Sequence, residues 1–453
     1  MKGQAKQREE ESLMKAKTLF TALLMLALVT AGRAQTLDKA KLDQLFDRLV
    51  EKNKGMGSLT LAKDGNVIYS RSFGYRQING SEKKPLTAET KYRIASITKM
   101  FTAVMIFQLA EENKLRLADT LDKFFPQIPN ASRITIGQIL THRSGIHDIE
   151  ADGSFGKQPR TREEMVARIA QGKPDFEPDA MHRYSNAGYI LLGYIVEKAG
   201  GKPYQEALKE RITSKIGLKD TYAGTGNTDP NKNEALSYIY IGGWKEAADL
   251  EFSVVAGAGS ILSTPTDMTK FIQALFDLKL VPPASLKQMT TISDGEGMGM
   301  EPFTFAGKTL YGHTGGSANS GAWLAYLPDE KLALAYTTNA KIYPVRDIVK
   351  GVFDIYWNQP FQIPTFEAFE VSPEILERYV GVYSIPGTPA RITISRDGAT
   401  LYFQPAGQSA VPIEATAEDK FKIDPFVVFE FDAAKGELTI TRAGQKRVFT
   451  KEE

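Results

Sequence analysis

Apolar side chains occupy nearly every position from Met100 to Ala110, on all faces that a helix would present. Such a pattern predicts a helix that is buried on all sides in a core. At about eleven residues the stretch is too short to span a membrane. Upstream of it, residues 58–74 are typical of a β-hairpin, because two strand-like runs are joined by the turn pair Asp64-Gly65.

Helical signals dominate the middle of the chain, from about Leu115 to Gly217. One helix is predicted from about Asn186 to Ala199, because the following pair of glycines stops it. Another helix begins after Thr264, which caps it, with Pro265 at its first position. Its apolar stripe has a helical period and consists of Met268, Phe271, Ile272, Leu275 and Phe276.

Strand signals return after that helix. Residues 311–316, 321–327 and 332–338 are predicted as strands, and a turn at residues 328–330 joins the last two. Strands at both ends of this region, with helices between them, favour an α/β (α+β) fold. We expect an antiparallel sheet flanked by helices, with a helical insertion, and an active site where sheet and helical part meet.

The pattern changes again near the C-terminus. Residues 358–372 are proline-rich and aperiodic, which indicates a linker. Beyond it, short runs alternate like strands, at residues 379–383, 390–395, 400–404, 427–431 and 437–441. We therefore predict a main domain at residues 35–357 and a small antiparallel β-barrel or sandwich at residues 373–453.

The N-terminal 34 residues are typical of a secretory signal peptide. Lys15 and Lys17 precede an apolar run, and small residues follow it up to Ala34, where cleavage is expected. The segment before Met14 is acidic, which is unusual for a signal, so we expect translation to start at Met14. A retained membrane anchor is the alternative, although the apolar run is short. The signal predicts a periplasmic or secreted protein.

Composition narrows the class of protein. The chain has 453 residues and a net charge of +2; residues 1–34 alone carry +3, which leaves the remainder near −1. A near-neutral body gives no support for nucleic-acid binding. The chain contains no cysteine, so neither a disulfide nor a lipid anchor on cysteine can form. We expect a monomer with no stable membrane anchor.

A serine followed three residues later by a lysine occurs four times, at Ser12, Ser81, Ser96 and Ser154. Only Ser96 precedes the predicted buried helix, which places Lys99 on the same face. A serine hydroxyl needs a nearby base to act as a nucleophile. Burial and the helix dipole both lower the pKa of a lysine, so we expect Lys99 to serve. The alternative for Ser96 is a simple helix cap.

Two further motifs follow in order. Tyr184-Ser185-Asn186 opens the predicted helix, and His313-Thr314-Gly315-Gly316 lies on a predicted strand whose glycines let a ligand approach the backbone. We expect the phenol pKa of Tyr184 to fall beside Lys99. The alternatives are a packed core tyrosine for Tyr184 and a helix cap for Asn186.

The three motifs together resemble the penicillin-recognising serine hydrolases, in particular the class C β-lactamase and D-alanyl-D-alanine carboxypeptidase group. The resemblance runs from about Leu42 to Tyr356 and implies acyl transfer through an ester on Ser96. It implies that Lys99 and Tyr184 move protons and that Asn186 binds a substrate carbonyl. The strand from His313 to Gly316 would hold the substrate, and the N–H groups of Ser96 and Gly316 would form the oxyanion hole. The C-terminal region resembles the lipocalin-like domain of many relatives.

His313 departs from the pattern of this family. Most β-lactamases carry a lysine there, which attracts a substrate carboxylate, whereas a histidine side chain is mostly neutral at pH 7. We therefore expect a D-amino-acid peptidase or esterase rather than an efficient β-lactamase. Its partner would be a small-molecule or peptide substrate, with peptidoglycan-related peptides among the candidates. The alternative function is a penicillin- or muropeptide-binding sensor that acylates without efficient turnover.

Other kinds of site find little support in the sequence. No Gly-x-Ser-x-Gly elbow, His-Glu-x-x-His motif or Walker loop is present. The chain has four histidines, and His142 and His147 do not share a helix face. We expect no metal and no cofactor, and we interpret His142 as a hydrogen-bonded structural residue of its loop. Residues 295–299 are rich in glycine and are predicted as a loop.

Overall fold

The structure is a computed structural model that describes residues 37–149, 158–240, 243–317, 319–366, 369–388, 390–407, 410–424, 427–442 and 445–452. The predicted signal peptide lies outside these residues. Within them, no helix combines the length and the apolar character that a membrane crossing requires.

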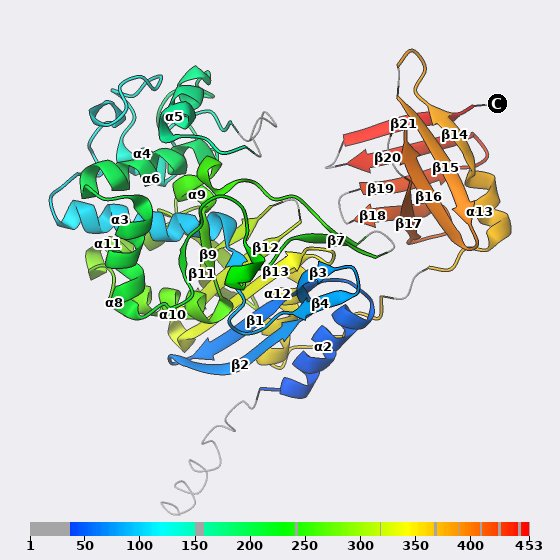
Figure 1. Ribbon diagram of the computed structural model, residues 1–453, viewed down its shortest axis with the longest axis horizontal. Coiled ribbons are helices and arrows are strands. Elements are labelled where there is room, and N and C mark those ends of the chain that lie inside the picture. The colour runs from blue at the N-terminus through cyan, green and yellow to red at the C-terminus, as the bar shows by residue number, and fades with distance from the viewer. Residues whose placement is uncertain are drawn as a thin grey trace, which may run out of the picture.

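A six-stranded antiparallel sheet, in the order β10-β11-β12-β13-β1-β2, forms the middle of the molecule (Figure 1). Its strands are β1 (Met56–Lys63), β2 (Asn66–Phe73), β10 (Glu301–Phe305), β11 (Lys308–Gly316), β12 (Gly321–Leu327) and β13 (Leu332–Ala340). The predicted hairpin is confirmed, and Asp64 and Gly65 both have the positive φ that its tight turn requires. Pairing of β13 with β1 joins strands from the two ends of the region into one sheet.

Helices cover both faces of this sheet. On one face, α2 (Lys39–Glu51) and α12 (Val345–Tyr356) bury Leu45, Phe46 and Phe353 against the strands. On the other face, α3 (Thr98–Glu111) and α10 (Pro265–Phe276) join a larger core, where Phe101 and Phe271 stack with ring centroids 3.7 Å apart. The mixed fold with helices on an antiparallel sheet is as predicted.

The helical part adjoins the sheet through α3, whose residues are buried on every face from Thr98 to Leu109. α6 (Asn186–Gly200) packs beside it and ends at Gly201, which has a left-handed conformation. The N-cap of α6 is Ser185, which accepts from the N–H of Gly188, so the alternative role of Asn186 as the cap is wrong. The other helices are α4 (Ile136–Leu140), α5 (Arg162–Gln171), α7 (Tyr204–Leu208), η3 (Lys209–Thr213), α8 (Ser214–Ile216), α9 (Ala256–Gly259) and α11 (Pro283–Thr290).

Short elements link these layers. They are β3 (Tyr75–Asn79), β4 (Glu82–Pro85), β5 (Tyr92–Arg93), β6 (Tyr222–Ala223), β7 (Tyr238–Tyr240), β8 (Trp244–Glu246) and β9 (Ile261–Ser263), with the single turns η1 (Ala95–Ile97), η2 (Leu121–Lys123), η4 (Pro230–Lys232), η5 (Phe252–Val254) and η6 (Pro328–Glu330). β5, β9 and β6 form a small sheet immediately before η1. This sheet fixes the chain at the point where it enters α3.

The C-terminal region is a closed eight-stranded antiparallel barrel. Its strands are β14 (Gly381–Ser384), β15 (Arg391–Asp397), β16 (Thr400–Pro405), β17 (Val411–Ala415), β18 (Lys420–Asp424), β19 (Val427–Asp432), β20 (Glu437–Arg442) and β21 (Gln445–Lys451). Residues 379–383 were expected as one strand, but α13 (Pro373–Tyr379) ends there and buries Leu376 and Tyr379 in the barrel core. β17, β18 and β21 were not predicted, because proline or charged residues interrupt their apolar pattern.

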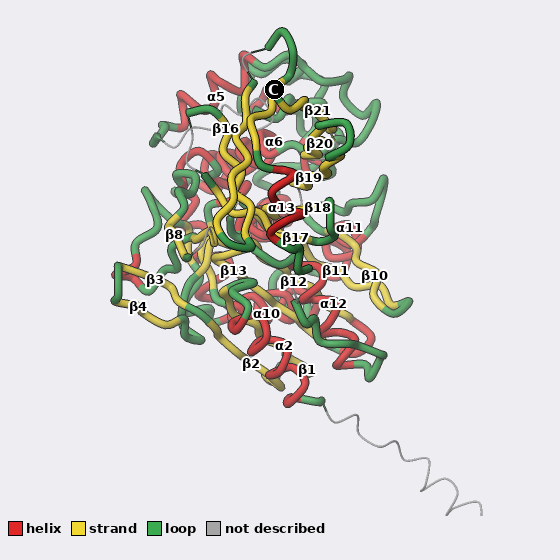
Figure 2. Tube along the Cα trace, turned by 90° about the vertical axis from the view of Figure 1, so that its right-hand side faces the viewer, coloured by secondary structure: helices red, strands yellow, loops and turns green. Residues whose placement is uncertain are grey.

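Figure 1 shows the helical part and the barrel at opposite ends of the long axis, and Figure 2 shows the barrel strands from the side. Lys54 of the main body donates to Glu414 of β17 at 2.9 Å, which ties the two parts together. Lys54 and Glu414 are both only partly exposed.

Candidate active site

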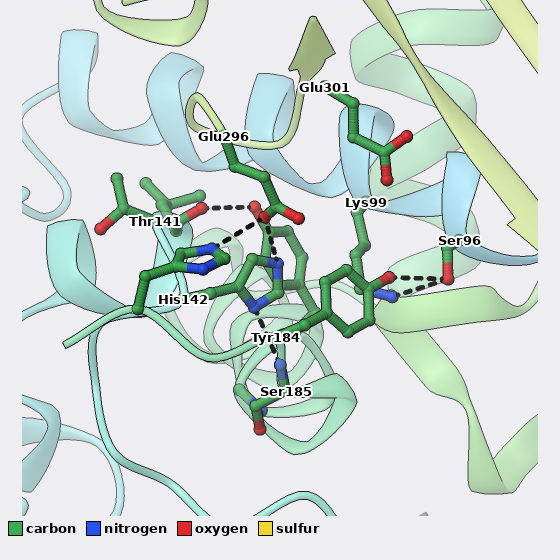
Figure 3. A network of polar contacts seen from close by, with 12 residues as sticks. Ser96, Lys99, Thr141, His142, Tyr184, Ser185, Glu296 and Glu301 are labelled. Carbon is green, nitrogen blue, oxygen red and sulfur yellow. Dashed lines mark hydrogen bonds and ion pairs between the residues drawn. The ribbon is translucent and has the colours of Figure 1, made fainter. Parts of the chain in front are cut away.

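Ser96 lies at the entrance to α3, in the single turn η1 that precedes it. The preceding residue, Ala95, has a φ of +45°, which is unusual for a residue with a side chain and marks a sharp turn of the backbone. The Oγ atom of Ser96 accepts hydrogen bonds from Lys99 Nζ at 3.0 Å and from Tyr184 OH at 2.8 Å. Figure 3 shows these three groups meeting at the serine oxygen.

Lys99 is fully buried, and its Nζ atom lies within hydrogen-bond distance of three oxygens. Besides Ser96 it donates to Asn186 Oδ1 at 2.7 Å and to the carbonyl of Ala258 at 3.0 Å. The nitrogen also lies 4.8 Å from the ring centre of Tyr184. Burial disfavours the charged form of an amine, whereas these acceptors favour it. Ser96, Lys99 and Tyr184 therefore form one hydrogen-bonded unit.

A close contact between two helices brings the Ala258 carbonyl to Lys99. A Cβ atom on Gly257 would lie only 2.6 Å from the Cα atom of Gly193 in α6. Only glycine permits this approach of α9 to α6. The contact places an acceptor in the core, where water does not reach Lys99.

Tyr184 stacks on the ring of His142, with centroids 4.4 Å apart and planes 24° apart. Burial above all raises the pKa of Tyr184, and the charges of Glu301 and Glu296 raise it further. The expectation that this pKa falls beside Lys99 is therefore wrong: desolvation of the phenol outweighs the hydrogen bond with Ser96, which lowers the pKa. At neutral pH Tyr184 is an uncharged hydrogen-bond donor to Ser96.

The ring of His142 packs against Tyr184, and Figure 3 shows no contact between His142 and Ser96. Its Nδ1 accepts from the N–H of Ser185 at 3.1 Å, and its Nε2 lies 3.5 Å from Glu296 Oε2. Burial, and after it the charge of Lys99, holds the pKa of His142 well below its ordinary value. These contacts agree with the interpretation of His142 as a hydrogen-bonded structural residue.

β11 runs past Ser96 at very short range. A Cβ atom on Gly315 would lie 2.1 Å from the carbonyl oxygen of Ile94, so only glycine allows the strand to pass η1. His313 is 2% exposed, and its Nδ1 lies 2.5 Å from the carbonyl oxygen of Thr314. Gly316 ends the strand and is exposed. The predicted strand residues therefore lie beside the predicted nucleophile.

Three acidic residues near the site were not predicted. Glu301 accepts from Thr314, and Asp148 accepts from Asn186 Nδ2 at 3.2 Å. Glu296 lies 3.4 Å from His182 Nε2 as well as close to His142, and burial raises the pKa of its carboxyl. Glu296 belongs to the glycine-rich loop at residues 295–299. A carboxylate among glycines shortly before the strand of His313 was the sequence signal that could have indicated a site residue there.

The fold and this cluster of serine, lysine and tyrosine are typical of a serine hydrolase. A family model described as Beta-lactamase matches residues 42–352, and the chain belongs to this family. Penicillin-binding protein 4* of Bacillus subtilis strain 168 is 28% identical over 84% of this chain and 90% of its own length.

Two further proteins are similar over the main body of the chain. The D-alanyl-D-alanine-carboxypeptidase/endopeptidase AmpH of Escherichia coli strain K12 is 29% identical over 57% of this chain and 69% of its own length. The crystal structure of D-amino acid amidase from Ochrobactrum anthropi SV3 with L-phenylalanine amide has a TM-score of 0.64 at 27% identity. That similarity covers 71% of this chain and 98% of the amidase.

Proposed function

We propose that the protein hydrolyses small amides or esters, such as D-amino-acid derivatives, D-Ala-D-Ala-type peptides or β-lactams, through an acyl-enzyme on Ser96. The observation that carries this proposal is the pair of hydrogen bonds that Ser96 Oγ accepts from Lys99 and Tyr184. Through these bonds a serine, a buried lysine and a partly buried tyrosine converge on one oxygen atom.

In the first step, Lys99 in its neutral amine form takes the proton of Ser96, directly or through Tyr184, as Ser96 Oγ bonds to the substrate acyl carbon. The N–H groups of Ser96 and Gly316 stabilise the oxyanion, and each such donor is worth about 3 kcal/mol. The bond to the leaving group then breaks, and Tyr184 OH protonates the leaving atom. Water reverses these steps and releases the acid.

Asn186 has a double role in this proposal. Its Oδ1 holds Lys99 and its Nδ2 points to Asp148, and a substrate carbonyl would approach the same side chain. D-amino-acid amides and esters are favoured because the relatives include a D-amino acid amidase and a D-alanyl-D-alanine carboxypeptidase. His313 carries no permanent positive charge, which further favours D-amino-acid amides and esters over β-lactams as substrates.

We further propose that residues 1–34 direct export to the periplasm or the medium, that residues 35–357 carry the chemistry, and that residues 373–453 form an accessory barrel after the linker 358–372. The pattern of the N-terminal segment and the peptidoglycan-related names of two relatives support export. Peptidoglycan-related peptides are therefore among the candidate substrates.

A fluorescent fluorophosphonate probe tests the nucleophile. We expect wild-type protein to be labelled once per chain and Ser96→Ala to lose the label while its melting temperature is unchanged. Ser81→Ala is the matched control, because Ser81 has a lysine at the same spacing but lies exposed in the turn between β3 and β4. Labelling that persists in Ser96→Ala contradicts the proposal. With a p-nitrophenyl ester as substrate, a stoichiometric burst of p-nitrophenolate without further turnover would instead assign the sensor function.

A further inference from the structure

A carboxylate of the protein occupies the hydrogen-bond donors of Thr314. Glu301 is the first residue of β10 and pairs with Gly312 of β11, so β10 does not cover the rest of that edge. The side chain of Glu301 extends past the end of β10 toward Thr314 of β11. Its carboxylate accepts from Thr314 N at 3.0 Å and from Thr314 Oγ1 at 3.0 and 3.3 Å.

The charge of Glu301 is not neutralised by a strong cation. No lysine or arginine in the described part of the chain forms an ion pair with it, and its nearest basic atom is His313 Nδ1, at 3.7 Å. The side chain is 21% exposed, so its carboxylate is neither fully solvated nor sealed in the core. Figure 3 shows its carboxylate directed toward the side of the site where Ser96 and Tyr184 lie.

The proposed mechanism places the leaving group on the side of the site where this carboxylate lies. It takes its proton from Tyr184 OH in the proposed mechanism, so it must lie on the Tyr184 side of Ser96. The ring of His313 is 6.4 Å from that of Tyr184, and Glu301 contacts Thr314 and lies 3.7 Å from His313 Nδ1. A negative charge on the leaving group would meet Glu301 and would find the donors of Thr314 already bound.

We propose that Glu301 selects the leaving group by charge, favouring amides and esters whose leaving group is cationic over neutral ones, and disfavouring those with a carboxylate. This inference rests on the proposed function and narrows its substrate class. Because the N–H and hydroxyl of Thr314 are bonded to Glu301, they are not available to a C-terminal carboxylate of a substrate. In this respect the chain would differ from enzymes that recognise such a carboxylate. The ordering follows from Coulomb interactions at short range in a partly solvated site.

A series of three N-acetyl-D-alanyl amides with one acyl group tests the proposal. Their leaving groups are 1,2-diaminoethane, D-alaninamide and D-alanine, which carry positive, zero and negative charge. We expect kcat/KM to fall by about five- to tenfold at each step, and the differences to shrink as salt rises from 0.05 to about 0.5 M.

Glu301→Gln keeps an acceptor for Thr314 and removes the charge. We expect the ratio of kcat/KM between the cationic and anionic substrates to fall at least fivefold in this variant. Glu296→Gln is the matched control, because Glu296 contacts His142 and His182 and not Thr314, and the ratio should persist in it.

Neutral p-nitrophenyl acetate separates this inference from the proposed function. If wild-type protein hydrolyses that ester but shows no charge order, or if Glu301→Gln retains the full ratio, the selection by Glu301 is refuted and the hydrolase stands. If neither the ester nor the amides react and Ser96 takes no probe, the proposed function itself fails.

Discussion

Replacing Tyr184 with phenylalanine removes one oxygen from the centre of the site. The lost group donates to Ser96 Oγ at 2.8 Å, while the ring keeps its stacking on His142 and its contact with Lys99. One lost hydrogen bond costs about 1 kcal/mol of stability, so the variant should fold. Loss of a proton-transfer group should slow acylation by about 10²- to 10⁴-fold.

The size of the effect should depend on the leaving group. An amide nitrogen needs a proton to leave, whereas p-nitrophenolate leaves without one. We therefore expect Tyr184→Phe to reduce kcat/KM for D-alanine amides by about 10³-fold and for p-nitrophenyl acetate by roughly tenfold. Stopped-flow measurement of acylation with both substrates gives the two numbers.

Tyr189→Phe is the matched control for this variant. Tyr189 also lies close to Lys99, with 5.6 Å between Nζ and the ring centre, but its OH donates to the carbonyl of Leu140. We expect its acylation rates to stay within about threefold of wild type. Equal losses on the amide and the ester in Tyr184→Phe, or the same loss in Tyr189→Phe, would refute the assignment of proton transfer to Tyr184.

Two further predictions concern packing and charge. Gly315→Ala should abolish labelling of Ser96 and lower the free energy of unfolding by about 1–3 kcal/mol, because its Cβ would lie 2.1 Å from the carbonyl oxygen of Ile94. Probe labelling measures the first effect and urea unfolding the second. Labelling of the variant at the wild-type level would contradict the close approach of β11 to Ile94. Burial raises the pKa of Glu296, so the stability from its protonated form is complete below its ordinary pKa and is lost as pH rises through the raised value. The melting temperature of Glu296→Gln minus that of wild type should therefore increase as pH rises from 4 to 8. A difference that does not change with pH would contradict the raised pKa.

The sequence predicts the architecture well where a pattern is local. Three local patterns each predict one element: the apolar run of α3, the glycines that end α6, and the Thr264-Pro265 pair that begins α10. The structure contains all three helices. The barrel was predicted as a type of fold, but β17, β18 and β21 were missed. Strands in a small barrel have one face toward water, so their apolar signal is weak.

The candidate site was predictable only in part. Ser96, Lys99 and Tyr184 follow from motifs, and the distances among them agree with the expectation. Glu301 reaches Thr314 through the register of β10 on β11, which a single sequence does not specify. The direction of the Tyr184 pKa was wrong because the degree of burial depends on packing from several segments.

The acyl-enzyme is the central claim, and mass spectrometry of the quenched reaction tests it most directly. Wild-type protein mixed with a p-nitrophenyl ester and acidified within its first turnover should gain the mass of one acyl group. Peptide mapping should place that mass on Ser96, and Ser96→Ala should gain none. Turnover of the ester by wild-type protein with the acyl mass on another residue, or an equal mass gain in Ser96→Ala, would contradict the account.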